Sequence, residues 1–157
     1  MKSLIESLKI IGIKKPTSYC NMTCYQVEVK GTTYFIPIEY QNSFLLGQGG
    51  DKYKTCIGDY RYLKIENWLT ENIIPNVCEN SATTISSYQL KHLCEDSIGG
   101  YVNNETIKYI LAMQEVPTVK STNTYPLNII YQISKSVIIK IYDNNRTLDQ
   151  TQSAEHD

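Results

Sequence analysis

Residues 86–111, SSYQLKHLCEDSIGGYVNNETIKYIL, constrain the fold most strongly, because they predict two amphipathic helices joined by a tight turn. Ser86 and Gln89 have the spacing of a capping box, which begins a helix. A Gly-Gly pair ends that helix, and one of the two asparagines at 103–104 begins the next one. The inward-facing residues of the two helices are expected to be Leu90, Leu93, Cys94, Ile107, Ile110 and Leu111, and Lys91, His92, Glu95 and Asp96 are expected to face outward.

Such a helix pair is found in DNA-reading helix-turn-helix proteins and also in helical hairpins that only pack. A DNA reader exposes its second helix, and here Asn103 and Lys108 would then reach the DNA. Residues 86–114 contain two lysines and three acidic residues, a net charge of −1, whereas affinity for DNA depends on neutralising phosphates. We therefore expect packing, and we keep Asn103 and Lys108 as candidate nucleic-acid contacts.

The flanking sequence predicts two β-hairpins and two more helices. A Ser/Glu capping box predicts a helix over residues 3–11, and apolar periodicity after Asp59 predicts another that ends at Pro75. Alternation on both sides of Lys30-Gly31 predicts a hairpin whose second arm, containing Pro37, lies at a sheet edge or ends there. The remaining expected elements are a glycine-rich loop at 45–58 with a short strand at 53–57, a linker at 78–85, and a second hairpin formed by residues 125–134 and 136–145.

This order of elements predicts a single α+β domain over residues 1–146. Its mostly antiparallel sheet consists of the two hairpins, with about four helices packed on one face. The polar segment 147–157 lacks periodicity, and we expect it to be a disordered acidic tail.

The helix pair resembles a segment of small uncharacterised phage and bacterial proteins, in which Ser-Tyr-x-Leu-Lys-His-x-x-Glu precedes Gly-x-Tyr-Val-x-Asn. The matching residues are Ser87, Tyr88, Leu90, Lys91, His92, Glu95, the glycine turn, Tyr101, Val102 and Asn104. This resemblance covers about 28 of the 157 residues. It implies a viral or mobile-element source, and no activity is established for those proteins.

Lys91, His92 and Glu95 form one candidate site within this segment, because their spacing places them close together on a helix. Such a cluster can hold a phosphate or pass a proton. It can equally be a solvated surface with a Lys–Glu pair one turn apart. The second interpretation is the stronger one, since the cluster lacks a nucleophile.

The five cysteines do not form a disulfide framework, because their number is odd and their spacing irregular. Cys20 and Cys24, with Cys56, Cys78 and His92, can be drawn as zinc ligands, but structural zinc sites usually contain two close pairs. We expect thiols without a metal, and whether Cys20 and Cys24 bind one stays open.

One strand motif suggests a metal-dependent nuclease. Glu28 and Lys30 are two residues apart, as in restriction-endonuclease-like enzymes, where a carboxylate binds Mg²⁺ and a lysine acts at the scissile phosphate. Glu39 or Asp59 would complete the site. The alternative is a pair of ordinary cross-strand charges.

Charge along the C-terminal part suggests another surface. Residues 118–146 contain Lys120, Lys135, Lys140 and Arg146 against one aspartate, a net charge of +3, and acidic residues follow in the tail. If the protein binds nucleic acid, we expect this region to contribute most.

The sequence as a whole favours a small intracellular, cytoplasmic protein that acts by binding a macromolecule. The expected partner is a host or viral protein, or DNA, with no cofactor and no membrane association, and a homodimer through a sheet edge is a further expectation. Mg²⁺ would be needed only by the nuclease alternative.

Overall fold

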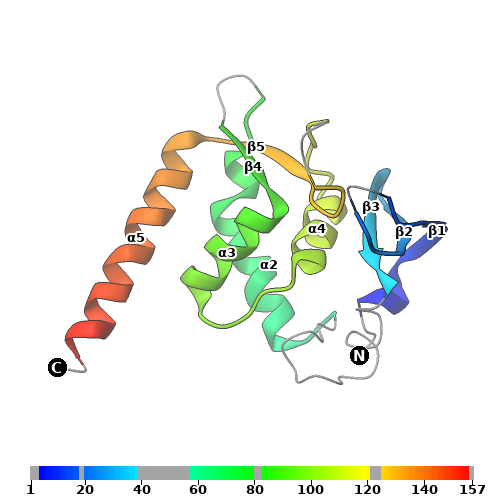
Figure 1. Ribbon diagram of the computed structural model, residues 1–157. Helices are drawn as coiled ribbons and strands as arrows, with labels where there is room; N and C mark the ends of the chain where they lie inside the picture. The colour runs from blue at the N-terminus through cyan, green and yellow to red at the C-terminus, as the bar shows by residue number, and fades with distance from the viewer. Residues whose placement is uncertain (1–3, 18–19, 39–56, 80–82, 121–124, 156–157) are drawn as a thin grey trace.

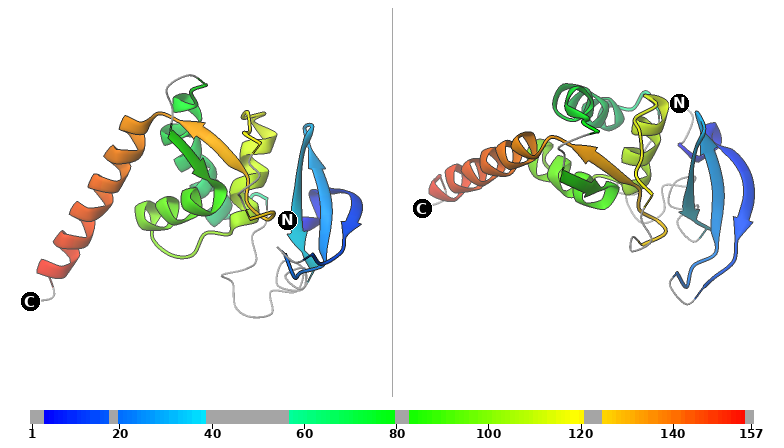
Figure 2. Two further views of the ribbon diagram at one scale, coloured as in Figure 1. Left: turned by 45° about the horizontal axis from the view of Figure 1, so that its top comes forward. Right: turned by 90° about the horizontal axis from the view of Figure 1, so that it is seen from above.

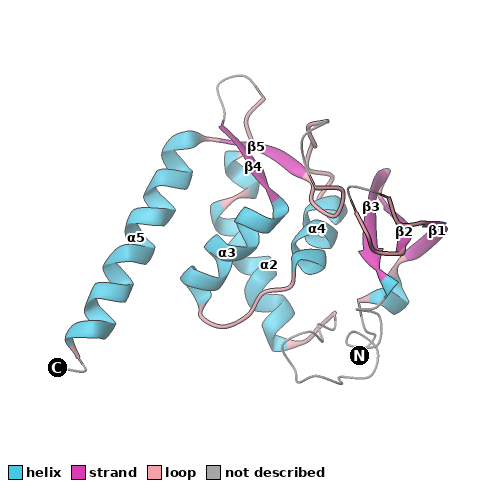
Figure 3. Ribbon diagram, in the orientation of Figure 1, coloured by secondary structure: helices cyan, strands magenta, loops and turns pink. Residues whose placement is uncertain are grey.

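The computed structural model describes residues 4–17, 20–38, 57–79, 83–120 and 125–155 (Figure 1). Within these residues the chain forms four α-helices and five strands, which make two small antiparallel sheets (Figure 3). The predicted α+β class is therefore confirmed.

The first sheet contains β1 (Lys9–Lys14), β2 (Cys24–Val29) and β3 (Thr32–Pro37), in the order β1-β2-β3. The predicted hairpin is confirmed as β2–β3. Lys30 and Gly31 both have positive φ, 49° and 82°, which suits the two-residue turn that joins twisted antiparallel strands. β3 ends at Pro37 and is an edge strand.

The predicted helix over residues 3–11 is wrong. Only a 3₁₀ turn, η1 (Ile5–Ser7), forms there, and β1 follows it. A helix of about nine residues is marginal by itself, whereas the β-branched side chains of Ile10, Ile11 and Ile13 suit a strand. Pairing with β2 therefore outweighs the local capping signal.

The helix predicted after Asp59 is confirmed as α2 (Tyr60–Asn72). The Asp59 side chain accepts a hydrogen bond from Arg61 N at 2.9 Å, which is the expected N-cap. Ile65, Trp68 and Leu69 are buried on one face. A 3₁₀ turn, η4 (Ile74–Asn76), then accommodates Pro75.

The two helices of the 86–111 stretch are confirmed as α3 (Ser87–Ile98) and α4 (Asn104–Met113). Both halves of the Ser86–Gln89 capping box form, and Asn103 caps α4. Every residue from Glu105 to Ala112 is buried. Because α4 is surrounded by protein, it lacks the exposed face that a recognition helix needs.

The C-terminal part differs most from expectation. The second sheet pairs β4 (Thr83–Ser86), which overlaps the end of the predicted linker, with β5 (Ile130–Ile133). The predicted hairpin around Lys135 is wrong, because α5 (Lys135–Ala154) follows β5 directly. The predicted disorder is also wrong for residues 147–154, which continue this helix.

One hydrophobic cluster joins the helices to both sheets. α4 lies beside the first sheet, and α5 packs against α3 with its C-terminal end directed away from the rest of the molecule (Figures 1 and 2). The glycine-rich loop and the strand predicted at 53–57 lie almost wholly outside the described residues. None of the described helices is long and apolar enough to cross a membrane.

Candidate functional site

The first candidate cluster lies on α3, and Lys91 does not face outward as predicted. Its side chain is 8% exposed, and its ammonium donates a hydrogen bond to the Glu95 carboxylate. The same ammonium lies 4.4 Å from the centroid of the Tyr101 ring, within the range of a cation–π contact. The Glu95 carboxylate and the Tyr101 ring therefore hold the Lys91 ammonium at a position that is largely closed to solvent.

Glu95 is the centre of this cluster. Its carboxylate also accepts hydrogen bonds from the Val102 backbone N–H at 3.0 Å and lies 3.0 Å from His92 Nδ1. Burial by itself would raise the pKa of Glu95, but the hydrogen bonds from Lys91 and Val102, with the nearby positive charges, hold it below its ordinary value. The carboxylate therefore stays charged and ties the start of α4 to α3.

This arrangement gives a structural role to most of the residues that carry the resemblance. Ser87 exchanges hydrogen bonds with the backbone of Ile129, Val102 is fully buried, and Asn104 donates to Asn128. His92 and Tyr88, whose rings meet edge to face at 4.5 Å, are about half exposed. The motif thus builds the helix pair rather than a site with a nucleophile.

Lys108, a predicted nucleic-acid contact, is fully buried. Its Nζ lies 3.2 Å from the Glu105 carboxylate and donates to the carbonyl oxygens of Phe35 at 2.9 Å and Leu127 at 2.7 Å. Burial lowers the pKa of Lys108, and the Glu105 charge opposes that shift. An ammonium with three protein partners and no exposed surface is not available to a phosphate, so this environment contradicts the prediction.

The Asn103 side chain also has a structural role. Its side chain is used at the start of α4, where Oδ1 accepts from Glu105 N at 3.0 Å, and the residue is 4% exposed. The prediction that it reads DNA bases therefore does not fit its position.

The basic residues predicted in the C-terminal region are exposed, but on a helix rather than a hairpin. Lys135, Lys140 and Arg146 lie on α5, and Lys120 lies in the loop that precedes β5. Arg146 pairs with Asp143 at 2.7 Å. Three basic residues of α5 therefore remain on the surface, although one of them is partly neutralised.

Helical spacing brings two of these basic residues into line with exposed apolar side chains. Lys135, Ile139, Tyr142 and Arg146 follow the spacing i, i+4, i+7 and i+11, which places them along one side of a helix. Ile139 and Tyr142 are 49% and 45% exposed. We call these four residues the α5 stripe.

Ile139 and Tyr142 are not predicted as surface residues from the sequence, because the β-branched run around them is typical of a strand. A signal for the helix does exist, since Ile138, Ile141 and Asn145 have helical spacing and are the buried residues of α5. Asn145 anchors the helix to α3: its amide donates to Leu93 O at 3.4 Å and its Oδ1 accepts from Ser97 Oγ at 3.0 Å.

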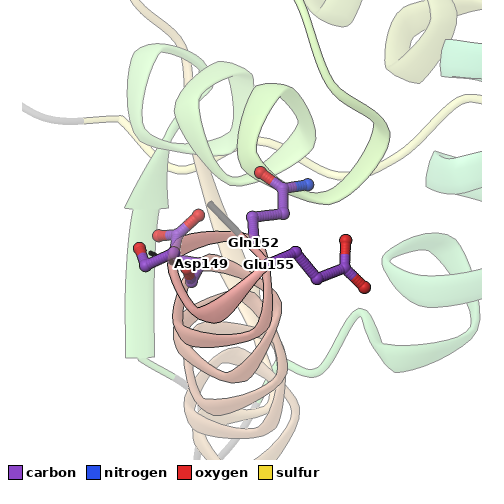
Figure 4. Close-up of a pocket in the computed structure, with 4 residues that line it drawn as sticks. Asp149, Gln152 and Glu155 are labelled. Carbon is purple, nitrogen blue, oxygen red and sulfur yellow. Dashed lines mark hydrogen bonds between the residues drawn. The ribbon is translucent and has the colours of Figure 1, made fainter. Parts of the chain in front are cut away.

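The C-terminal end of α5 offers no enclosed site. A hollow of about 370 Å³ is lined there by Asp149, Gln152, Ser153 and Glu155, all from this one helix and its C-cap. Figure 4 shows the labelled side chains projecting from the helix in different directions. Since no other described element contributes to the lining, these residues form open helix surface.

The residues predicted for the nuclease site have separate structural roles. Glu28 lies 3.9 Å from the Lys9 ammonium, Lys30 is in the hairpin turn, and Asp59 caps α2. Glu39 lies outside the described residues. In the described part of the chain, no three His, Cys, Asp or Glu side chains are grouped to hold a metal ion, so nothing there adds support to the nuclease alternative.

Cys20 and Cys24 are both buried free thiols beside Leu127. Burial, with the neighbouring Cys20, raises the pKa of Cys24 to about 11. A thiol with such a pKa is protonated near neutral pH and is a poor metal ligand in that state. Whether the pair binds a metal stays a prediction.

Compared with known proteins, the chain matches no family model, no curated protein and no solved structure. The resemblance to phage and bacterial proteins therefore stays a prediction.

Proposed function

We propose that the protein acts by binding another macromolecule, and that the α5 stripe is the contact surface. The observation that carries this proposal is the exposure of Ile139 and Tyr142 between Lys135 and Arg146 on a 20-residue helix. Large apolar side chains aligned with charges on one helix face are typical of a surface that meets a partner.

A protein partner fits this surface better than DNA does. The helix carries acidic residues at 143 and 149 as well as three basic ones, and Arg146 is already paired with Asp143. A DNA-binding surface relies on unpaired cations, whereas aromatic and apolar anchors rimmed by both charges suit a protein.

The test is affinity capture from host-cell lysate with the full chain and with the double variant Ile139→Glu/Tyr142→Glu. We expect at least one protein to be captured by the unaltered chain and reduced tenfold or more by the double variant. The matched control is Tyr60→Glu/Leu63→Glu on α2, where both residues are also exposed, and it should retain the partner.

Fluorescence anisotropy with a 30-base-pair DNA, measured at low and high salt, separates the two partner classes. Strong salt-dependent binding that Lys135→Glu and Arg146→Glu abolish would assign the surface to DNA instead. Capture that is unaffected by the α5 double variant, together with no DNA binding, would overturn the proposal.

A further inference from the structure

A second surface lies at the opposite end of the molecule, beside β3. A groove of about 530 Å³ separates this strand from the residues that precede β5. The ribbon views place residues 125–129, which directly precede β5, next to β3 (Figures 1 and 2). The groove is lined by Gly31, Thr32, Thr33 and Phe35 on one wall and by Thr118, Val119, Lys120, Pro126, Asn128, Ile129 and Ile130 on the other.

The backbone of β3 decides what this groove can recognise. In an antiparallel pair, residues alternate between those whose N–H and C=O face the neighbouring strand and those whose groups face away. Ile38 N donates to Thr23 O at 2.9 Å, so residue 38 faces β2. Counting back in steps of two, Ile36, Tyr34 and Thr32 face β2 as well, and Thr33 and Phe35 face the groove.

An independent contact confirms this orientation. The carbonyl of Phe35 accepts a hydrogen bond from Lys108 Nζ at 2.9 Å, on the side away from β2. In the described part of the chain, the N–H and C=O of Thr33 and the N–H of Phe35 make no hydrogen bond. Unpaired strand groups of this kind are a template for another extended chain.

The charges around the groove indicate what that chain should carry. Lys120 is exposed in its lining, and the Lys14 ammonium lies 4.5 Å from the centroid of the Phe35 ring. No acidic residue is among the described lining residues. Opposite charges across an interface attract the correct partner and fix its register.

We propose that this groove binds an extended acidic peptide of a partner protein, which adds a strand to the edge of β3. The peptide backbone pairs with Thr33 and with the Phe35 N–H, and its acidic side chains face Lys120 and Lys14. This is strand addition, in which main-chain hydrogen bonds give affinity and side chains give specificity. The site is separate from the α5 stripe and does not depend on it.

A single peptide fits this groove better than the sheet edge of a second copy. Neighbouring strands lie about 4.8 Å apart, so the pairing strand must lie directly beside the wall formed by residues 118–120 and 126–130. A second copy would bring its own wall against the first. One extended chain needs only the space beside Thr33 and the Phe35 N–H, because at the Phe35 carbonyl the edge is already closed by Lys108, which also donates to Leu127 O.

The test is selection from a displayed library of random 12-residue peptides, with the full chain as bait and Thr33→Pro as the counter-selection. Proline at residue 33 removes the outward N–H and leaves the pairing of β2 with β3, because Thr33 does not face β2. We expect net-acidic peptides whose affinity falls at least tenfold with Thr33→Pro and with Lys120→Glu. Thr33→Val keeps the N–H and should keep the affinity.

Three further results decide the outcome. If Thr33→Pro does not fold by circular dichroism, N-methylation of alternate residues in the selected peptide replaces it and should reduce binding equally. Ile139→Glu/Tyr142→Glu should leave peptide binding unchanged, which separates this site from the α5 stripe.

The proposal is overturned if no peptide is enriched, or if enriched peptides bind Thr33→Pro and Lys120→Glu as tightly as they bind the unaltered chain. It is also overturned if the chain instead forms a dimer that Thr33→Pro dissociates.

Discussion

At the scale of the residue, Lys108 shows how a buried charge can join distant parts of this chain. Its ammonium connects α4 to the backbone of β3 and to the Leu127 carbonyl. Burying an ammonium is costly unless it is paired and hydrogen bonded, and here Glu105 and the two carbonyl groups supply those partners. The residue therefore stabilises a junction rather than a ligand site.

Lys108→Met should destabilise the protein by about 3 kcal/mol, because it leaves the Glu105 carboxylate without its buried partner. Urea unfolding followed by circular dichroism measures the change. Lys140→Met, at an exposed position of α5, is the control and should change stability by less than about 0.5 kcal/mol. Equal stability of the two variants would contradict the assigned role of Lys108.

Tyr34→Phe should instead stabilise the protein. The Tyr34 hydroxyl is buried, and the structure gives it no hydrogen-bond partner in the described part of the chain. Removing a buried hydroxyl that lacks a partner relieves a desolvation cost, so we expect a gain of roughly 1 kcal/mol in the free energy of unfolding. A loss of similar size in the same urea experiment would show that the hydroxyl has a partner in solution.

At the scale of the elements, α2 holds the turn between α3 and α4. The Arg61 guanidinium donates to Gly99 O at 2.8 Å and to Tyr101 O at 2.6 and 3.0 Å. Gly100 has a φ of 80°, and a Cβ added there would lie 3.1 Å from Arg61 Nη2. The turn therefore needs glycine both for its backbone conformation and for the approach of this side chain.

Arg61→Ala should destabilise the protein by about 2 kcal/mol, since charge-assisted hydrogen bonds to the turn are lost. Thermal and urea unfolding measure the effect. Arg146→Ala is the matched control, because Arg146 is exposed and pairs with the exposed Asp143, and such pairs contribute little. If both arginine variants unfold alike, the turn does not depend on α2.

At the scale of the whole molecule, burial of ionisable groups predicts how stability depends on pH. Burial raises the pKa of Cys94 from 9.0 to about 12 and also raises the pKa values of Tyr34, Tyr62 and Tyr131. Each group loses its proton more readily in the unfolded chain. Its contribution to stability is therefore complete below the unfolded pKa and is lost as pH rises toward the folded pKa.

The free energy of unfolding should accordingly fall as the pH is raised from about 9 to 11, the range in which the unfolded thiols and tyrosines titrate. Lys108, whose pKa is lowered, acts in the opposite direction, but it is one group against several. Urea unfolding at a series of pH values measures the slope. Tyr131→Phe should make the decline shallower, and a flat profile over this range would contradict the prediction.

The sequence by itself determined the elements that local signals specify. α2 and α3 begin at side-chain caps, the Gly99-Gly100 turn separates α3 from α4, and the Lys30-Gly31 turn fixes the register of β2 and β3. Each of these signals acts within a few residues. They predict the α+β class and the buried faces of α2 and α3.

Only the tertiary structure decided the elements whose partners are distant in the chain. Ile10, Ile11 and Ile13 form a strand because β2 pairs with them, and Thr83–Ser86 forms one because β5 does. The Ile-rich segment after Lys135 is a helix because Ile138, Ile141 and Asn145 pack against its neighbours. A lysine is normally predicted to face solvent, but Lys91 and Lys108 are buried because Glu95 and Glu105 pair with them. Local sequence does not encode these contacts, and burial depends on them.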